Sequence, residues 1–325
     1  MVASVVPIFF RAPASAAHYK FQTATPNFKI RTSNFPMKFS RTDADIFVPE
    51  SAAANAAPLT PEAALARTTH LCVAAHQDDI EIMAWHGIAE CFGRSDRWFS
   101  GVVVTNGAGS PRSGLYGQYD DTAMQAIRRQ EQRKAAYVGD YSIQLQLAHP
   151  SSAVKDKTNA DVQADLATLF ETADAEVVYL HQPADKHDTH IGVLAHALRA
   201  LRALPADKRP RRVLGCEVWR DLDWMLDTDK QVLDAGRYPN VAAAAVGVFD
   251  SQISGGKRYD LATAGRRLAH ATYHTSHATD AFQGINWAMD LTPLVADPSL
   301  DIAAYTQAYI DRFAADVRDR LARFA

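Results

Sequence analysis

From residue 69 onward, short apolar runs alternate with amphipathic stretches along most of the chain. The apolar runs are typical of buried strands, and stretches with an apolar residue every three or four positions are typical of helices. Strands are expected at 70–75, 99–105, 141–147 and 175–180, and helices at 79–92, 121–138, 159–172 and 190–204. Strands and helices that alternate with short links predict an α/β fold with a mainly parallel sheet.

The pattern is less regular after residue 219. One more helix is expected at 261–273, and a closing helix at 301–324. One face of the closing helix carries a stripe formed by Ile302, Tyr305, Tyr309, Phe313 and Val317. We expect this stripe to pack against the sheet, although it would also permit a homo-oligomer.

Residues 1–60 lack a regular pattern and contain scattered alanine, serine and proline. They predict an irregular N-terminal arm, extended or partly disordered, before a single domain at 61–325. Met37 offers an alternative start to Met1. The first residues resemble a weak signal peptide, but no basic segment precedes the apolar stretch and Arg11 interrupts it, so a cytoplasmic location is expected.

Composition narrows the range of partners. The 325 residues carry a net charge of −3, so no strongly basic surface is expected to bind nucleic acid. No apolar run approaches the roughly 20 residues that a membrane span needs. The three cysteines stand singly in apolar surroundings and are interpreted as core residues. A small molecule is therefore the expected partner.

Charged residues are crowded into the stretch "CVAAHQDDIEIMAWHG", directly after the first expected strand. In parallel α/β sheets, ligands bind at the carboxyl ends of strands. One acid there could simply cap the next helix, but His76, Asp78, Asp79 and Glu81 exceed that need. A divalent cation such as Zn²⁺, which takes imidazole and carboxylate ligands, explains the excess. One of the adjacent aspartates would bind metal and the other would face the water as a base.

A second polar cluster follows the strand expected at 175–180. The stretch "HQPADKHDTH" contains His181, Asp185, His187, Asp188 and His190. Both clusters would lie at the same edge of a parallel sheet. His187 and His190 are three residues apart near a helix start, which lets both face one centre. Together the clusters predict a metal site that binds Zn²⁺ or another divalent cation.

These residues resemble motifs of a known family. "AHQDDIE" resembles the "AHPDDxE" motif of the PIG-L/LmbE-like N-acetylglucosaminyl deacetylases, and "HDTH" is similar to their "HxxH" motif. Order and spacing agree over about residues 69–204. A helix similar to the family's "RxxExxxAAxxxG" segment is represented by Arg128, Glu131, Ala135, Ala136 and Gly139.

The resemblance implies a Rossmann-like fold and a zinc hydrolase that removes acetyl groups from N-acetylated amino sugars. It implies that His76, Asp79 and His190 are the zinc ligands. Asp78 would be the general base, and His187 would polarise the tetrahedral intermediate or protonate the leaving amine.

The resemblance also implies a substrate-side role for Arg128, and Arg112 lies in a loop that could reach the sugar. Glu81 is expected in the helix's first turn, behind the metal ligands. Gln77 replaces the family's usual proline, and Thr189 stands where the family often has an aspartate. The carboxylate that orients His187 is therefore expected to be Asp188 or Asp185.

Other functions remain as alternatives. An amidase acting on another N-acyl conjugate would use the same residues. A nucleotide-binding dehydrogenase would use "VVVTNGAGS", where Gly107 and Gly109 fit "GxGxxG" but Arg112 replaces the third glycine. A non-catalytic sugar-binding protein would hold zinc only for structure.

The C-terminal third offers few assignments. His274 and His277 could line the substrate cleft or lie on the surface. Trp219 and Trp224 could stack on a sugar ring, but we interpret both as core residues.

Overall fold

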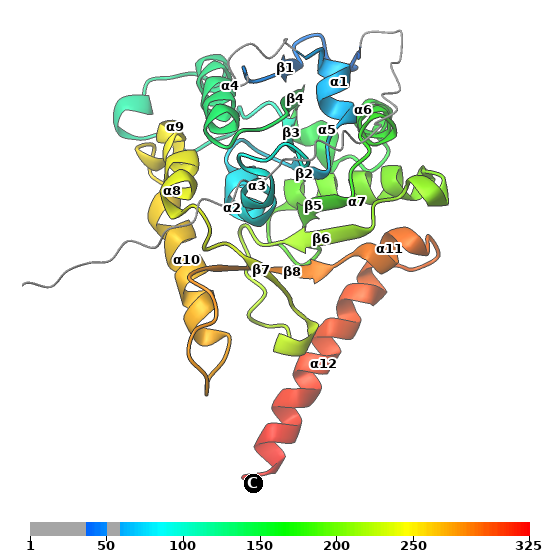
Figure 1. The fold of residues 1–325 in the computed structure, drawn as a ribbon, viewed down its shortest axis with the longest axis vertical. Coiled ribbons are helices and arrows are strands. Elements are labelled where there is room, and N and C mark those ends of the chain that lie inside the picture. The colour runs from blue at the N-terminus through cyan, green and yellow to red at the C-terminus, as the bar shows by residue number, and fades with distance from the viewer. Residues whose placement is uncertain (1–36, 51–58) are drawn as a thin grey trace, which may run out of the picture. The chain divides into compact units, whose positions relative to one another are not determined.

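A mixed sheet forms the centre of the computed structural model, which describes residues 37–50 and 59–325 (Figure 1). The strand order is β1-β4-β3-β2-β5-β6-β8-β7 in an eight-stranded sheet. The strands β4, β3, β2, β5 and β6 run parallel, whereas β1, β8 and β7 are antiparallel to their neighbours. The strand bounds are β1 Asp45–Phe47, β2 His70–Ala74, β3 Phe99–Thr105, β4 Ile143–His149, β5 Val177–His181, β6 Arg212–Cys216, β7 Gln231–Asp234 and β8 Ile285–Asp290. The predicted mainly parallel α/β fold is confirmed.

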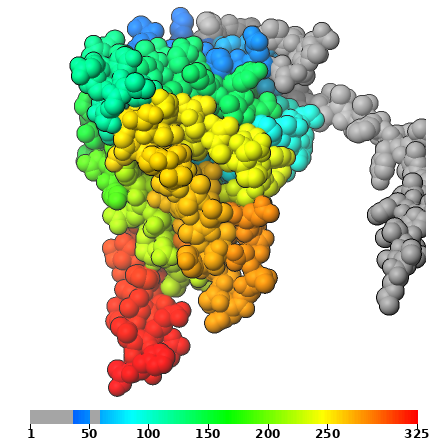
Figure 2. Space-filling model, turned by 90° about the vertical axis from the view of Figure 1, so that its left-hand side faces the viewer, coloured from blue at the N-terminus to red at the C-terminus, as the bar shows by residue number. Residues whose placement is uncertain are grey.

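Helices cover both faces of this sheet, as its parallel strands require because they are buried on both sides. One face is covered by α1 (Pro61–Ala66), α5 (Ser151–Lys155), α6 (Ala160–Thr172), α7 (Asp188–Ala203) and α11 (Thr292–Ala296). The other is covered by α2 (Asp79–Met83), α3 (Trp85–Cys91), α4 (Asp121–Val138), α8 (Pro239–Gly247), α9 (Asp250–Ile253) and α10 (Tyr259–Tyr273). Figure 2 shows α8 to α10, in yellow and orange, together on one side of the molecule.

Several helices have the bounds that their sequence signals predict. The helix α4 ends at Val138 before Gly139, and the side chain of Asn159 caps α6 by accepting a hydrogen bond from the backbone of Val162. The helix expected at 79–92 is instead two helices, because Ala84 between α2 and α3 has a non-helical backbone. The break precedes Trp85, which is wholly buried and donates its indole N–H to the backbone oxygen of Arg237.

The order of the parallel strands creates a site for ligands. From β2 the chain first builds β3 and β4 on one side, then returns to build β5 and β6 on the other. The strands β2 and β5 pair directly, so the loops that follow them lie next to each other. Such a reversal of strand order is where open α/β sheets bind ligands. The two polar clusters are therefore neighbours, as the sequence predicted.

The last helix, α12 (Ile302–Ala322), packs its first turns against the body of the protein, and Arg312 in its middle forms an ion pair with Asp229 at 2.8 Å. Tyr305 and Tyr309 pack against the core, and the hydroxyl of Tyr305 donates to the backbone oxygen of Asp290 at 2.7 Å. Phe313 and Val317 are each 38% exposed, and the red helix extends beyond the sheet in Figure 1. The prediction that the whole stripe packs on the sheet is therefore wrong for its second half.

Part of the predicted N-terminal arm belongs to the sheet. Residues 45–47 form β1, an edge strand paired with β4, and Arg133 forms an ion pair with Asp45. The signal-like first residues and the start at Met1 lie outside the described residues, and the boundary at residue 60 stays a prediction. Within the described part of the chain, no helix is both long and apolar enough to cross a bilayer.

Candidate metal and active site

Three side chains from the two polar loops converge at the adjacent ends of β2 and β5. His76 lies in the loop after β2, Asp79 is the first residue of α2, and His190 lies in the first turn of α7. His76 Nδ1 is 3.2 Å from His190 Nε2 and 3.3 Å from Asp79 Oδ2, and His190 Nε2 is also 3.3 Å from Asp79 Oδ2. These three atoms, which we call the metal triad, come from the residues that the family resemblance implied.

The triad fits a divalent cation. Zinc bonds of about 2.0–2.1 Å in tetrahedral geometry place the ligand atoms roughly 3.3 Å apart. The second ring nitrogen of His190, Nδ1, lies 3.2 Å from Asp185 Oδ2, so a carboxylate holds the ring with Nε2 toward the triad. Two imidazole nitrogens and one carboxylate oxygen are also a typical donor set of catalytic zinc sites.

A second group that could hold a metal shares His190 and adds His181 and Asp185. His181 Nε2 already accepts a hydrogen bond from the backbone of Ala75 at 2.9 Å, and its ring stacks on His190 at 3.8 Å. This group is wholly buried, whereas His76 and Asp79 of the metal triad line a cavity. His181 therefore supports the ring of His190 from behind.

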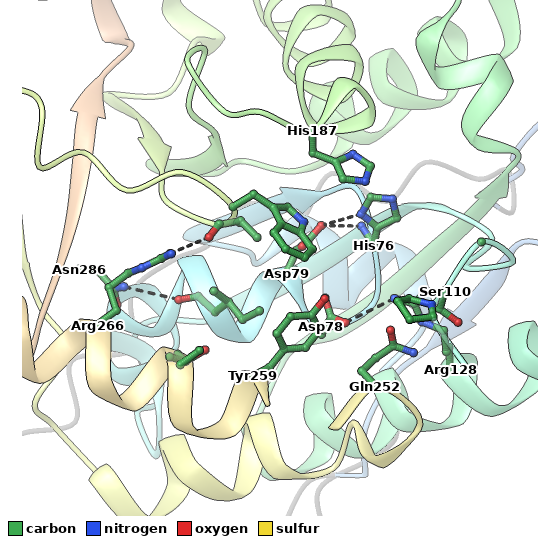
Figure 3. Close-up of a pocket in the computed structure, with 17 residues that line it drawn as sticks. His76, Asp78, Asp79, Ser110, Arg128, His187, Gln252, Tyr259, Arg266 and Asn286 are labelled. Atoms are coloured by element: carbon green, nitrogen blue, oxygen red, sulfur yellow. Dashed lines mark hydrogen bonds and ion pairs between the residues drawn. The ribbon is translucent and has the colours of Figure 1, made fainter. Parts of the chain in front are cut away.

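Asp78 points away from the metal triad toward Arg128. Its Oδ2 is 3.4 Å from Arg128 Nη2, and its backbone N–H donates to Gln132 Oε1 at 3.2 Å. Asp78 has a φ of 96°, a strained conformation of the kind that clusters at functional sites. This backbone turn lets the adjacent aspartates face different partners (Figure 3).

Burial and neighbouring charges give the carboxylates different acidities. Burial raises the pKa of Asp78 well above its ordinary value, and the nearby Arg128 partly opposes that effect. Burial also disfavours ionisation of Asp79, but the contacts with His190 and His76 outweigh it and hold the Asp79 pKa well below its ordinary value. Asp79 is thus kept as a carboxylate, and Asp78 is the better proton acceptor.

His187 caps the start of α7 and faces the triad. Its Nδ1 accepts a hydrogen bond from the backbone of Thr189 at 3.3 Å, and its ring centre is 4.9 Å from that of His76. Nε2 is consequently the nitrogen that carries a proton in the neutral ring. Burial lowers the pKa of His187, which favours that neutral form.

The prediction that a carboxylate orients the His187 ring is wrong. Among the described residues, no carboxylate forms a hydrogen bond with its ring. Asp185 binds the ring of His190 and, through Oδ1, the backbone N–H of His187 at 3.1 Å, while Asp188 is exposed. The backbone of Thr189 holds the His187 ring, which explains how the site does without an aspartate at that position.

The two arginines that were predicted to contact substrate differ in their position relative to the cavity. Arg128 lines the cavity and donates to the backbone oxygens of Gln77 at 2.9 Å and Gly107 at 3.2 Å. Arg112 forms an ion pair with Asp121 and donates to the backbone oxygen of Ala108 at 2.8 Å. It is not among the described residues that line the cavity, so its predicted contact with substrate is not supported.

Glu81 is buried behind Asp78 and does not reach the metal triad. Its Oε1 accepts hydrogen bonds from Gln132 Nε2 at 2.9 Å and from the Tyr141 hydroxyl at 2.7 Å. Burial raises the pKa of Glu81 to about 8. Because Gln132 also accepts from the backbone of Asp78, Glu81 helps to hold the candidate base rather than the metal ligands.

The cavity next to these residues encloses about 190 Å³. Much of its wall comes from residues after position 217 that the sequence motifs missed, namely Val218, Trp219, Gln252, Tyr259, Ala262, Thr263, Arg266 and Asn286. Trp219 is therefore a wall residue rather than the core residue we expected. The signals in the sequence were the tryptophan at position 219 and the polar segment at residues 250–260. His274 and His277 are not among the lining residues of the described chain.

Residues 71–201 match a family model described as PIG-L: GlcNAc-PI de-N-acetylase. This segment is a PIG-L family domain. The resemblance found in the sequence motifs is thereby confirmed. The PIG-L domain contains the metal triad, Asp78, Arg128 and His187, whereas Trp219, Tyr259, Arg266 and Asn286 lie beyond the matched residues.

Solved structures share the fold of the PIG-L domain. The conserved protein TT1542 from Thermus thermophilus is 16% identical, with a TM-score of 0.51 over 72% of this chain and 99% of that chain. The N,N'-diacetylchitobiose deacetylase from Pyrococcus horikoshii is 14% identical, with a TM-score of 0.50 over 68% and 83%. The 4-carboxy-2-hydroxymuconate hydratase GalB from Pseudomonas putida is 18% identical, with a TM-score of 0.50 over 69% and 96%. A comparison with curated protein sequences found no match.

Proposed function

We propose that this protein is a metal-dependent hydrolase that removes the N-acetyl group from an N-acetylated amino sugar or its conjugate. The observation that carries the proposal is that Asp78 and His187 line one cavity together with His76 and Asp79 of the metal triad. The matched family is described as a de-N-acetylase, which agrees with this chemistry.

The metal triad would hold the cation, for which we propose Zn²⁺. When bound, such a cation polarises a carbonyl and increases the acidity of water. Asp78 accepts the proton of the attacking water, and the adjacent Arg128 favours the ionised form of this buried carboxylate. His187, whose Nε2 carries a proton in the neutral ring, can donate to the developing oxyanion or to the departing nitrogen.

The contacts around Gly107 argue against the dehydrogenase alternative. A Cβ at Gly107 would lie 2.5 Å from Gln77 Oε1, so the Gln77 side chain packs against the glycine that a phosphate would have to approach. The next α-helix, α4, begins only at Asp121 and offers no helix N-terminus directly after the glycines. The turn instead helps to hold Arg128 through the backbone oxygen of Gly107.

One of the structures with a similar fold is a hydratase, so the reaction must be tested directly. We would assay a panel of N-acetylated amino sugars for acetate release by the zinc-loaded protein, with and without a chelator. The expected result is acetate release that the chelator abolishes and added Zn²⁺ restores. Acetate release that is insensitive to the chelator would contradict the metal assignment. If no panel member releases acetate while an unsaturated acid is hydrated, the deacetylase proposal is wrong.

A further inference from the structure

The cavity wall away from Arg128 contains a second arginine. Arg266 on α10 is half-buried, and its Nη1 donates to the backbone oxygen of Val218 at 2.7 Å. Among the described residues, no carboxylate lies within 4.0 Å of its guanidinium. Figure 3 shows Arg266 and Asn286 on one side of Asp79 and Arg128 on the other. The guanidinium of Arg266 is planar and permanently charged, and its remaining N–H groups can donate to a ligand at this end of the cavity.

A second cation lies beside the same wall. Lys257 Nζ is 5.0 Å from the centre of the Trp219 ring, and it too forms no ion pair within the described chain. Trp219 lines the cavity, and its ring meets that of Tyr259 edge to face at 6.2 Å. An aromatic surface with cations nearby suits a ligand that has both a ring and a negative charge.

The carboxylates on this side are already committed to other groups. Glu217 is 1% exposed, and its two oxygens accept hydrogen bonds from the backbones of Leu222 at 2.7 Å and Trp287 at 3.1 Å. Asp260 is paired with Arg258 at 2.8 Å. Burial raises the pKa of Glu217 and the charge of Arg266 acts to lower it, but among the described residues neither carboxylate forms an ion pair with Arg266.

A polar group with no partner lies in the same part of the wall. Asn286 is 3% exposed and its Nδ2 donates to the backbone oxygen of Ile82 at 3.5 Å, which leaves its buried Oδ1 unpartnered. Buried polar atoms without a partner are uncommon, so this oxygen is suited to accept from a ligand hydroxyl. Arg266 and Asn286 together therefore offer donors and an acceptor to one ligand.

We infer that the ligand of this cavity carries an anionic substituent, a phosphate or a carboxylate, which Arg266 binds while Trp219 packs against the sugar ring. Lys257 adds a second positive charge near the anion. The inference rests on the proposed function only for the amino-sugar part of the ligand. It narrows the substrate class to acidic N-acetylated amino sugars.

Calorimetric titration of the zinc-loaded protein with deacetylated compounds tests this without turnover. The compounds are glucosamine, glucosamine 1-phosphate, glucosamine 6-phosphate and muramic acid, which separate a phosphate from a carboxylate. We expect at least one anionic compound to bind tenfold or more tightly than glucosamine, and Arg266→Gln to remove most of that advantage, since charge-assisted hydrogen bonds are worth roughly ten- to hundredfold in binding.

Arg258→Gln is the matched control, because it removes the same charge from an exposed arginine near the start of the same helix. Arg258→Gln should change the ratio of affinities between the anionic compound and glucosamine by no more than about twofold. Arg266→Lys should keep part of that ratio. Thermal unfolding of each variant shows whether it is folded.

The inference is wrong if no anionic compound binds more tightly than glucosamine, or if both arginine variants lose the advantage equally. It is also wrong if the advantage survives Arg266→Gln, since the anion would then bind the metal. None of these outcomes depends on acetate release, so failure of the proposed function is a separate result.

Discussion

Asp185 Oδ2 lies 3.2 Å from His190 Nδ1, on the opposite side of the ring from the nitrogen that faces His76 and Asp79. This contact holds the ring in one tautomer and makes the metal-facing nitrogen more basic. Replacing Asp185 with alanine should therefore weaken Zn²⁺ binding by roughly 10- to 100-fold. Competition with a chromophoric chelator measures the affinity. Asp188→Ala changes an exposed carboxylate three residues away and should have no effect. Equal losses in the two variants would show that only overall charge matters.

Asp78→Asn tests the candidate base. Asparagine tolerates a positive φ, so the loop should keep its backbone at the observed 96°. Zinc content should stay near that of the unchanged protein, while acetate release falls by roughly 100-fold or more because proton transfer is lost. Metal analysis and initial-rate measurements on the same preparation test the zinc content and the rate of acetate release. His190→Ala should instead lose the metal. Loss of zinc from Asp78→Asn would show that Asp78 is a ligand.

Gly192 allows α7 to approach α5 closely. A Cβ at this position would lie 2.5 Å from the backbone oxygen of Val154. Because this oxygen belongs to the backbone, it cannot move aside as the end of a flexible side chain could. Gly192→Ala should therefore lower the free energy of unfolding by about 1–3 kcal/mol, measured by urea denaturation. Gly265→Ala, on α10 with nothing within 4 Å, should raise it by up to about 1 kcal/mol. A neutral Gly192→Ala would mean that the helices separate at little cost.

Glu217 predicts a pH dependence of stability outside the metal site. Burial raises its pKa in the folded protein from 4.5 to about 7. Between these values the folded state keeps a proton that the unfolded state releases, so stability is lost as pH rises. The contribution is full below pH 4.5 and lost by about pH 7, and its size is about 3 kcal/mol. The difference in free energy of unfolding between the unchanged protein and Glu217→Gln should shift by that amount between pH 5 and 8. A pH-independent difference would contradict it.

Local sequence signals predicted which side chains meet at the metal triad. His76, Asp79 and His190 follow or lie near the ends of two apolar strands, and the rules of parallel sheets bring such ends together. The partner of the His187 ring could not be predicted, since a backbone N–H from Thr189 leaves no trace in residue type. The break at Ala84 was also missed, because one amphipathic pattern continues through both helices.

The rest of the cavity wall could not be predicted from the sequence, for a different reason. Trp219, Tyr259, Arg266 and Asn286 reach the cavity from β8, α10 and the loop after β6, and no short motif links them. Their meeting depends on the antiparallel addition of β8 to β6, a long-range contact that local periodicity does not encode. The exposure of Phe313 likewise depends on where α12 leaves the body of the protein.

The cavity is thus shared between two stretches of the chain. The groups that we propose for catalysis lie within residues 71–201, and most of the other residues that line the cavity lie between residues 218 and 286. An engineer can therefore vary the cavity wall by exchanging the later stretch between relatives while keeping residues 71–201, which hold the proposed catalytic groups.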